Sequence, residues 1–595
     1  MKKIVILGGG YGGVATGKKL HKYFKKHNDI QITLIDKKPY HTLMTELHEV
    51  AAGRTPEDSI RIDLNSIFEG RKVDVVLDEI TNIDFKAKQL TSDTKIYDYD
   101  YLVIGAGSEP AFYGVEGAQE FGHTLWSYED AVNLKEHIHN MFRLAEKKSS
   151  LEERQKLLTF VVAGGGFTGI EMAGELGEYK EELCRIYDVS KSEVKLYVVD
   201  MLPKILPMLP SDLIKKSEDR LKKLGVEILN NVSITKVNEE SVELGEGKVI
   251  PTKTLIWNAG VQASGFSSKL GLTLGKRGRI QTNEFLQTIE HSEVYAVGDN
   301  AYLEEEKSPQ GIPQIVETAI QTGAVIAHNI HADVTKGSKK AFKSNYHGYM
   351  VSIGGRYAVA NLGSNNNLNI KLSGFMAMLM KHLVNIHYLL EVAGFNRIWT
   401  YMMHEFFHIK KERSFVGGHF SKSSPNFWLV PLRLFLGGMW IYEALNKISD
   451  GWLNPENIYI VQTATSAATD WAESADYVEP LLSQPWPIVQ WGLDTIVAPF
   501  AFQFQAMAVI TELVIGVMLI VGLFTVVAAG ISTIMTFVFI LSAMAGLEVL
   551  WYTFASIALI GGSGSTFGLD YYLYPYLKKI YKKIPLIKKW YLYTD

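Results

Sequence analysis

Two glycine-rich turns carry the clearest chemical signal in this sequence. Each has the spacing G-x-G-x-x-G directly after a short apolar run, residues 4–7 for the first turn and 160–163 for the second. A strand, such a turn and the start of a helix together leave backbone amides that face a pyrophosphate. We therefore expect two dinucleotide sites, built on Gly8, Gly10 and Gly13 and on Gly164, Gly166 and Gly169.

An acidic residue closes the next predicted strand after each turn. Asp36 follows residues 31–35, and Asp200 follows residues 194–199. A carboxylate at that position holds the ribose hydroxyls of a nucleotide and repels the 2′-phosphate of NADPH. Asp200 therefore predicts NADH rather than NADPH at the second site. An ordinary strand-to-helix turn is the alternative, and the two acids argue against it.

Two α/β domains are needed to position these sites. The strand-like run 101–108 marks the first crossing between the domains, and residues 294–299 return to the first domain and end in Asp299. We expect FAD to stay bound to one domain while the other nucleotide exchanges. The predicted fold is α/β, with a Rossmann-type FAD-binding domain at 1–115 and 280–335 interrupted by an NADH-binding domain at 116–279.

Composition narrows the class of protein further. The 595 residues include 60 Lys and Arg against 64 Asp and Glu, so the net charge is -4 and a nucleic-acid partner is not expected. The single cysteine, Cys184, argues against a disulfide framework and against a redox pair within one chain. Electrons must then travel through a cofactor. The apolar run 4–7 is too short for a signal peptide, which predicts a cytoplasmic first domain.

Several longer motifs make the chain resemble the type II NADH:quinone oxidoreductases. They are the two glycine turns, HTLMTELHEVAAG at 41–53, TLIWNAGV at 254–261 and VYAVGDN at 294–300, and the resemblance covers residues 1–413. It implies two dinucleotide-binding domains, bound FAD, NADH and a quinone as substrates, and peripheral attachment to a membrane. A sulfide:quinone oxidoreductase is the competing member of the same superfamily, but it needs several cysteines to carry sulfur.

The resemblance also implies roles for individual residues. Around FAD it places Gly8, Gly10, Gly13, Asp36, Lys37, His41 and Asp299, and around NADH it places Gly164, Gly166, Gly169 and Asp200. It brings Glu171 near the flavin, where the family has a glutamate implicated in electron and proton transfer. A glutamate in the first turn of a helix is also stabilised by the helix dipole without any chemistry, so both interpretations stay open.

A quinone pocket is expected over the flavin. The family lines it with a short helix that carries two glutamines four residues apart, and the matching residues here are Glu317 and Gln321. An ionised glutamate cannot donate a hydrogen bond to a quinone carbonyl, whereas a glutamine can. Glu317 must therefore be protonated, turned away, or part of a proton path. The predicted catalytic residues are Glu171, Glu317 and Gln321.

Residues 336–413 are expected to form a small sheet followed by membrane-attachment helices. Strand patterns occupy 348–354 and 356–362, and residues 372–411 mix aromatic residues and methionines with lysines and arginines. This composition suits helices in the membrane interface, and core packing against the FAD domain is the alternative. His404, Glu405 and His408 form the H-E-x-x-H pattern of zinc proteases. We expect no metal there, because no third ligand follows at a recognised spacing.

Residues 414–595 are expected to form an all-α transmembrane domain with four spans. The apolar stretches 427–448, 500–524, 525–547 and 549–569 are each long enough to cross a bilayer at about 1.5 Å per residue, with buried soluble helices as the alternative. The loop 449–499 holds seven acids and no basic residue, whereas the tail carries six lysines between 578 and 589. Both ends of the domain should therefore face the cytoplasm. Arg433, Glu443 and Glu512 are candidates for a quinone contact or a proton route.

The stretches RLFLGGMWIYEALNKISDGW at 433–452, GLFT at 522–525 and GGSGSTFGLDYYL at 561–573 resemble DoxX-type four-helix membrane proteins. This part either anchors the enzyme or dedicates it to a separate quinone pool or an extracellular electron-transfer chain. The whole sequence predicts a multi-pass bacterial membrane enzyme of the respiratory chain. It would pass two electrons from NADH through FAD to a menaquinone-type acceptor without pumping protons. Homodimerisation and electron-transfer partners in the membrane are left open, and the alternative function is a non-catalytic, nucleotide-sensing membrane assembly factor.

Overall fold

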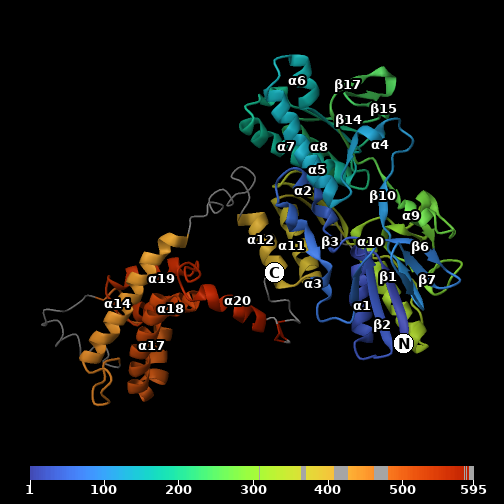
Figure 1. Ribbon diagram of the computed structural model, residues 1–595. Helices are drawn as coiled ribbons and strands as arrows, with labels where there is room; N and C mark the ends of the chain where they lie inside the picture. Colours follow the sequence, from blue (N-terminus) through green and yellow to red (C-terminus); the bar gives the residue numbers. More distant parts are fainter. Residues whose placement is uncertain are drawn as a thin grey trace. The chain divides into compact units, whose positions relative to one another are not determined.

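The computed structural model describes residues 1–306, 308–363, 370–407, 426–460, 480–581, 583–584 and 586–587. The described residues divide into two compact units, one within Met1–Lys422 and the other within Ser423–Ile587 (Figure 1). The first unit holds all the strands, and the second is helical. The predicted HExxH residue His408 lies outside the described residues.

The first sheet of the larger unit carries the first glycine turn. Its five parallel strands lie in the order β21-β9-β1-β2-β5. Their bounds are β1 Lys2–Leu7, β2 Ile30–Asp36, β5 Asp74–Leu77, β9 Tyr101–Ile104 and β21 Val294–Ala296. Helix α1 (Tyr11–Phe24) starts at the turn and packs along α10 (Val316–Thr335). The first turn therefore lies at the carboxyl end of the central strand β1, where open α/β sheets bind ligands.

The second sheet repeats this arrangement around the second glycine turn. Its parallel strands lie in the order β11-β18-β12-β13-β14. Their bounds are β11 Gly122–Thr124, β12 Thr159–Ala163, β13 Lys195–Val199, β14 Val226–Leu229 and β18 Thr254–Trp257. Helices α5 (Tyr128–Glu146), α7 (Phe167–Ile186) and α8 (Ser211–Lys223) cover this sheet (Figure 1). The α/β fold predicted from the two turns is confirmed.

Short antiparallel strands mark the connection between the two sheets. Strand β10 (Ser108–Pro110) pairs with β19 (Val261–Ala263). The segment through which the chain leaves the first sheet therefore lies beside the segment through which it returns. Strand β1 ends in four buried apolar residues, 4–7, and every residue of β12 is buried. Such continuous apolar runs are typical of parallel strands that helices cover on both faces, because both sides of the strand leave water.

A small antiparallel sheet and two helices complete the larger unit. The sheet consists of β23 (Gly348–Ser352), β24 (Ala358–Leu362) and β25 (Ile370–Gly374), and α11 (Phe375–Val392) and α12 (Phe395–Met402) follow it. The first two strands were expected from the sequence. The third occupies the start of the segment that was expected to be helical, because residues 370–374 pair with β24.

The second unit is built from α14 (Leu429–Ser449), α17 (Ala501–Val521), α18 (Thr525–Leu541), α19 (Val549–Leu559) and α20 (Asp570–Tyr581). In the described part of the chain, one helical stretch, Pro487–Val521, is long and apolar enough to cross a membrane. Helix α19 has 11 residues and spans about 16 Å at 1.5 Å per residue, whereas a bilayer core needs about 30 Å. The prediction of four spans is therefore not confirmed.

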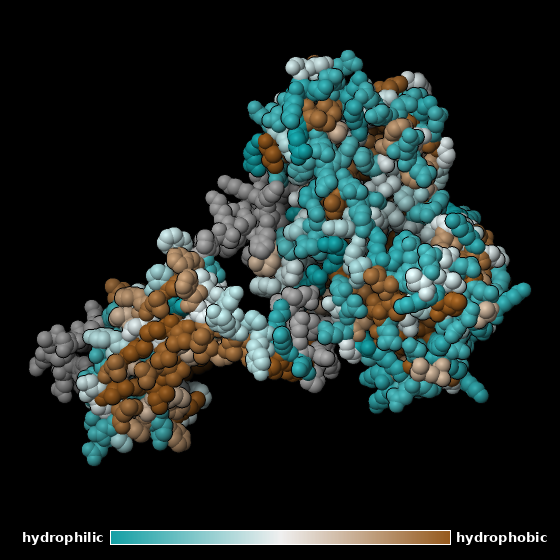
Figure 2. All heavy atoms as spheres, viewed as in Figure 1, coloured by the Kyte–Doolittle hydropathy of each residue, from teal (hydrophilic) through white to brown (hydrophobic). Residues whose placement is uncertain are grey.

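Polar side chains tie the helices of the second unit together. Arg433 is 1% exposed and donates to the carbonyl oxygens of Ser563 and Phe567, each at 2.8 Å. Lys447 pairs with the buried Glu512, and Tyr552 donates to Glu443 at 3.2 Å. Arg433 and Glu512 therefore have structural partners inside the unit, and Figure 2 shows a band of apolar side chains across the face of the unit seen in that view.

Candidate functional site

The first glycine turn is shaped by close backbone contacts. Gly8 has a φ of +107°, and a Cβ there would lie 2.2 Å from the carbonyl oxygen of Gly105. A Cβ on Gly13 would lie 1.9 Å from the oxygen of Gly8, whereas Gly10 faces open space. Asp36 accepts hydrogen bonds from the amides of Gly9 and Lys38. Helix α1 has no side-chain cap, so its first amides remain available to an anion.

The second turn has the same geometry. Gly164 has a φ of +102°, and a Cβ there would lie 2.4 Å from the carbonyl oxygen of Asn258. Gly169 packs against Gly164 as Gly13 packs against Gly8, and Gly166 again faces open space. Asp200 accepts from the amide of Gly165 and from that of Leu202 at 2.7 Å. The two turns are therefore equivalent in glycine placement and in the position of their acids.

Buried polar groups next to the turns fit a nucleotide. The Asn258 side-chain nitrogen and the Asn300 side-chain oxygen are buried and have no hydrogen-bond partner within the described residues. Asn258 lies beside the second turn, and Asn300 follows Asp299 at the end of the first sheet. Asp299 accepts a hydrogen bond from Ser108 at 2.7 Å, and burial raises its pKa. A polar ligand at each turn would satisfy such groups.

His41 connects the first turn to α11. It is 1% exposed, its Nδ1 donates to the carbonyl oxygen of Gly9 at 3.0 Å, and its Nε2 accepts from the Tyr388 hydroxyl at 2.8 Å. Burial lowers the pKa of His41 to about 4, so the ring is neutral, which these two bonds require. Lys37, by contrast, points its ammonium at the surface, where it pairs with Glu79 at 3.1 Å.

A buried ionic cluster lies where α2 (Leu47–Ala51), α7, β23 and α11 meet. Its members are Glu46, His48, Glu49, Arg54, Glu175, Lys381 and Glu405, each at most 7% exposed, with Glu171 at its edge. Arg54 is bonded to Glu49, to Glu175 at 2.9 Å and to Glu405 at 2.7 Å. Lys381 pairs with Glu49 at 2.7 Å.

The carboxyl groups outnumber the cations in this cluster, so some of them must hold protons. Burial raises the pKa of Glu405 to about 8, although Arg54 acts against it, and burial together with Glu49 raises that of Glu46 well above its usual range. Burial would also raise the pKa of Glu49, but Arg54 and Lys381 outweigh it and hold that pKa well below its usual range. The cluster therefore combines ionised and protonated carboxyls in one buried volume.

Glu171 lies at the edge of this cluster. Ser352 donates to it from its amide at 3.4 Å and from its hydroxyl at 3.3 Å, and Lys381 donates to the same hydroxyl at 3.2 Å. Burial raises the pKa of Glu171 to about 7, and Lys381 partly offsets this. A carboxyl that titrates near neutral pH can give and take a proton under cellular conditions.

Glu317 and Gln321 have a different set of partners. Glu317 accepts from the amide of His347 at 3.2 Å, is bonded to its imidazole, and accepts from Gln321 at 3.2 Å. Gln321 donates to the carbonyl oxygen of Asn345 at 2.7 Å and accepts from the Asn345 amide at 3.0 Å. The structure thus groups Glu171 with Lys381, and Glu317 with the loop at 345–347.

One residue of the HExxH pattern, Glu405, belongs to the same cluster. Glu405 is 4% exposed and bonded to Arg54, so it faces the protein interior rather than lipid. Oxygen atoms of Glu46, Glu49 and Glu405 lie within 4.8 Å of one another. Arg54 is bonded to Glu49 and Glu405 and Lys381 to Glu49, whereas Glu46 accepts a hydrogen bond from Asn385, so these acids have partners inside the protein. Neither the size of this cluster nor the part Arg54 takes in it was expected from the sequence.

Comparisons with known proteins agree with this geometry. The pyridine nucleotide-disulphide oxidoreductase family matches residues 2–323. A type II NADH:quinone oxidoreductase of Staphylococcus saprophyticus is 30% identical over 400 residues, which covers 66% of this chain and 96% of the relative. The enzyme of that name from Staphylococcus epidermidis is 32% identical with the same coverage.

Solved structures show the same fold at low identity. The NDH2 of Plasmodium falciparum in complex with NADH has a TM-score of 0.60 at 18% identity, covering 68% of this chain and 98% of its own. The sulfide:quinone oxidoreductase of Aquifex aeolicus has a TM-score of 0.55 at 19% identity, covering 68% and 95%. With two matched glycine turns and relatives of this identity, the chain belongs to the pyridine nucleotide-disulphide oxidoreductase family and, within it, to the type II NADH:quinone oxidoreductases.

Proposed function

We propose that this enzyme is a membrane-bound, FAD-dependent NADH:quinone oxidoreductase that does not pump protons. The observation that carries the proposal is the pair of equivalent glycine turns, each followed by an uncapped helix and each with an acid that accepts a hydrogen bond from a turn amide, that of Gly9 or Gly165. The first turn, with Asp36 and His41, would hold FAD. The second, with Asp200, would hold NADH, because a carboxylate there repels a 2′-phosphate. When bound, FAD supplies hydride acceptance from NADH and two-electron delivery to a quinone.

The protein residues supply protons and orientation. Glu171, with a pKa of about 7, would give a proton to a reduced quinone, and Ser352 and Lys381 connect it to Glu49 by hydrogen bonds. Tyr11, Ile320 and Tyr388 line one end of a pocket next to the first turn, and their apolar surfaces suit a quinone ring. Because Glu317 is bonded to His347, we propose that it holds the loop at 345–347 in place and does not contact the quinone directly.

Membrane attachment is supported by both units. Helix α11 exposes Phe375, Leu383 and Val384 at 73%, 49% and 51% of their surfaces, while its opposite face packs on the small sheet. An amphipathic helix of this kind lies in the bilayer interface. The second unit adds the apolar stretch Pro487–Val521. We infer a bacterial cell-membrane location, with the catalytic domains and the C-terminal tail in the cytoplasm.

The role of the second unit is a separate part of the proposal. Its sequence resemblance to DoxX-type proteins suggests either an anchor or a device that commits the enzyme to one quinone pool or to an extracellular electron-transfer chain. Removal of residues 420–595 distinguishes the two. Loss of membrane attachment with all acceptors retained supports the anchor, whereas selective loss of one acceptor supports commitment.

Steady-state kinetics of the purified full chain test the proposed reaction. We expect NADH oxidation with a menaquinone analogue and with ubiquinone analogues, a strong preference for NADH over NADPH, and no proton translocation in sealed vesicles. A protein that binds nucleotide but reduces no quinone would refute the proposal and favour the assembly-factor alternative. Crosslinking and light scattering of the same preparation determine whether the enzyme is a homodimer.

A further inference from the structure

A small cavity adjoins the buried ionic cluster on the side that faces α12. It lies between that helix and the 3-10 helix η2 (Glu57–Ile60), and its volume is about 20 Å³, which is room for one water molecule. Its inner wall holds Glu46, Glu49 and Glu405, and its outer wall includes half-buried residues of both helices. A water molecule in the cavity would therefore lie between the cluster and the surface.

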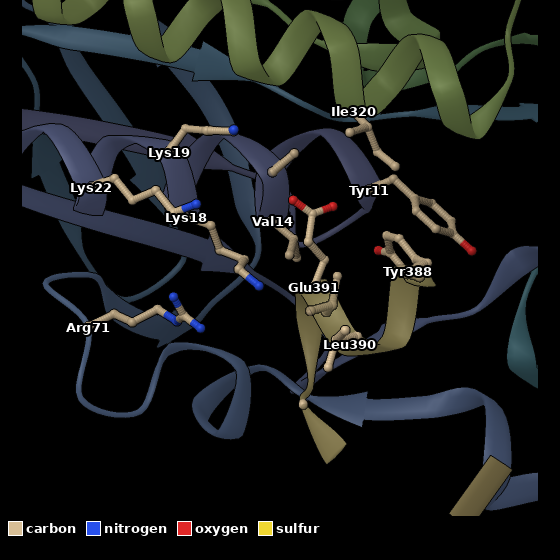
Figure 3. A pocket seen from close by; sticks show the side chains of 13 residues that line it. Tyr11, Val14, Lys18, Lys19, Lys22, Arg71, Ile320, Tyr388, Leu390 and Glu391 are labelled. Atoms are coloured by element: carbon tan, nitrogen blue, oxygen red, sulfur yellow. The ribbon is translucent and has the colours of Figure 1, made fainter. Parts of the chain in front are cut away.

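This cavity is separate from the larger pocket beside the first glycine turn. Leu389 of α11 lines the cavity, whereas its neighbours Tyr388 and Leu390 line the larger pocket, where Tyr388 lies beside Tyr11 (Figure 3). The two spaces thus lie on different sides of the end of α11, and no residue lines both. Neither the proposed hydride transfer nor the proposed quinone pocket uses the small cavity.

The cavity suits water because a buried hydroxyl there lacks a partner. Thr55 lines the cavity and is 5% exposed, and its hydroxyl has no hydrogen-bond partner within the described residues. The three acids of the inner wall have oxygen atoms within 4.8 Å of one another, a separation that one water molecule can bridge. A single water would therefore accept from Thr55 and contact the carboxyl groups of the cluster.

Glu46 and Glu405 are the members of the cluster that hold exchangeable protons. Burial raises the pKa of Glu405 to about 8 and that of Glu46 well above its usual range, so both carboxyls are protonated near neutral pH. One oxygen of Glu46 accepts from the Asn385 amide at 2.7 Å, which leaves the other to carry the proton. Glu49 beside them is ionised, because its two cationic partners outweigh the effect of burial on its pKa. Two proton donors therefore lie next to one acceptor.

Hydrogen bonds connect Glu49 to Glu171. Lys381 donates to Glu49 at 2.7 Å and to the Ser352 hydroxyl at 3.2 Å, and that hydroxyl donates to Glu171 at 3.3 Å. His48 also lies between the two carboxyl groups, but its ring nitrogens are 3.8 Å from each of them, which is longer than a hydrogen bond. The route through Lys381 is therefore the one that hydrogen bonds complete.

We propose that Glu46 and Glu405 return a proton to Glu171 after each turnover, and that they take this proton from water in the small cavity. The inference rests on the proposed function, in which Glu171 gives a proton to the quinone. Glu46 and Glu405 touch neither the nucleotide turns nor the quinone in this scheme. They act through Glu171 and set the rate at which it is reloaded.

The protons balance in this scheme. Reduction of one quinone by one NADH takes up one proton from water, because the hydride brings the other hydrogen together with both electrons. After Glu171 has given its proton, Lys381 passes one to it through the Ser352 hydroxyl. Lys381 regains a proton from Glu49, which one of the two protonated acids supplies. Water in the cavity then restores the proton of that acid.

Stopped-flow kinetics of the purified full chain separate the first proton from the later ones. Enzyme that is reduced with one equivalent of NADH at about pH 6 already holds the proton on Glu171, so a single reoxidation by a menaquinone analogue needs no reloading. Turnover with excess NADH needs reloading in every cycle. The double variant Glu46→Gln with Glu405→Gln keeps the shape of both neutral acids but has no acidic proton to release. We expect an unchanged first reoxidation and a steady-state rate that falls at least about tenfold.

Two results would overturn the proposal. One is an unchanged steady-state rate in the double variant. The other is an equal fall in both rates, because damage to the fold or to the quinone site would slow the first reoxidation as well. The control is Glu57→Gln, which removes an acid of η2 that pairs with Lys135 at 2.8 Å near the surface and should change neither rate.

Matched pairs of variants test the route itself. In the Glu405→Gln background, Glu46→Ala leaves space for a formic acid molecule, so added formate should restore most of the steady-state rate. Glu46→Leu fills the same space and should not respond. Thr55→Val removes the hydroxyl that would hold the water and should slow steady-state turnover, whereas Thr55→Ser keeps it and should not. Equal responses to formate, or equal rates of the two Thr55 variants, would contradict the route.

The first reoxidation reports on the proposed function separately. Glu171→Gln should slow this step, whereas the variants of Glu46 and Glu405 should not. A first reoxidation that does not depend on Glu171 would refute its proposed role at the quinone. A normal effect of Glu171→Gln together with an unchanged steady-state rate in the double variant would overturn the proton supply alone.

Discussion

Replacement of Glu171 by Gln gives a prediction for both stability and catalysis. Burial raises the pKa of this carboxyl from its ordinary 4.5 to about 7. At 1.36 kcal/mol per pKa unit, folding becomes less favourable by about 3 kcal/mol as the pH rises from below 4.5 to above 7, because the folded state holds the proton more tightly than the unfolded state. A glutamine keeps the shape of the protonated acid and cannot ionise.

Glu171→Gln should therefore stabilise the enzyme at alkaline pH and leave it nearly unchanged below pH 5. For a unit of the length of Met1–Lys422, with an unfolding entropy of about 2.1 cal/mol/K per residue, the full effect corresponds to a rise of about 4 °C in the unfolding temperature. The measurement is thermal unfolding of the full chain at a series of pH values, with the release of flavin as the signal. The control is Glu181→Gln on the same helix, a surface residue paired with Lys191, for which no pH-dependent gain is expected.

The catalytic part of the same prediction concerns flavin reoxidation. If Glu171 gives a proton to the quinone, the rate of reoxidation should fall as the pH rises through about 7, and the variant should lose this dependence along with at least about a hundredfold of the rate. Reduction by NADH should change much less. A variant that still titrates near pH 7 and gains no alkaline stability would refute the reasoning.

Three further changes test other parts of the account. Arg54→Met removes the cation that neutralises several buried carboxylates and should cost about 3–5 kcal/mol, measured as a lower unfolding temperature and a lower yield of folded enzyme. Asp200→Asn removes the charge that repels a 2′-phosphate, so the ratio of kcat/KM for NADH over NADPH should fall at least about tenfold. Gly13→Ala would place a Cβ 1.9 Å from the carbonyl oxygen of Gly8 and should abolish flavin retention. The control is Gly10→Ala, because Gly10 faces open space and the backbone should tolerate a Cβ there. Equal flavin content in the two variants would contradict the geometry of the turn.

The nucleotide turns could be predicted because their signal is local. Glycine spacing, a short apolar run and an acid after the next strand all lie within about 40 residues, and the backbone contacts of Gly8 and Gly13 explain why the spacing is required. The small sheet was predicted in part for the same reason. Its third strand was missed because residues 370–374 become a strand only through pairing with β24.

The buried ionic cluster could not be predicted in the same way. Glu49 and Lys381 pair across 332 residues of sequence, and Arg54 and Glu405 across 351. A weak signal was present, because Glu46 lies directly before α2, His48 and Glu49 lie within it among apolar residues, and Lys381 lies among apolar residues of α11. Charged residues in such positions need partners. The identity of these partners cannot be read from the sequence. Glu405 was assigned to a membrane-interface segment, whereas the structure buries it.

The second unit illustrates a different difficulty. An apolar stretch predicts a helix, but its length in sequence does not fix the length of that helix. Residues 549–569 were expected to form one span, whereas α19 ends at Leu559 and the turn that follows supplies carbonyl oxygens to Arg433. Arg433 was a candidate for function, and its hydrogen bonds give it a structural role.

The central claim is that two nucleotides bind at the two turns with their reactive rings in contact. Anaerobic stopped-flow mixing of the purified full chain with NADH tests it most directly, followed by a second mixing with a menaquinone analogue. The account predicts a yellow protein whose flavin absorbance bleaches rapidly with NADH, slowly with NADPH, and returns when the quinone is added. A colourless protein, or a bound flavin that NADH does not bleach, would contradict it.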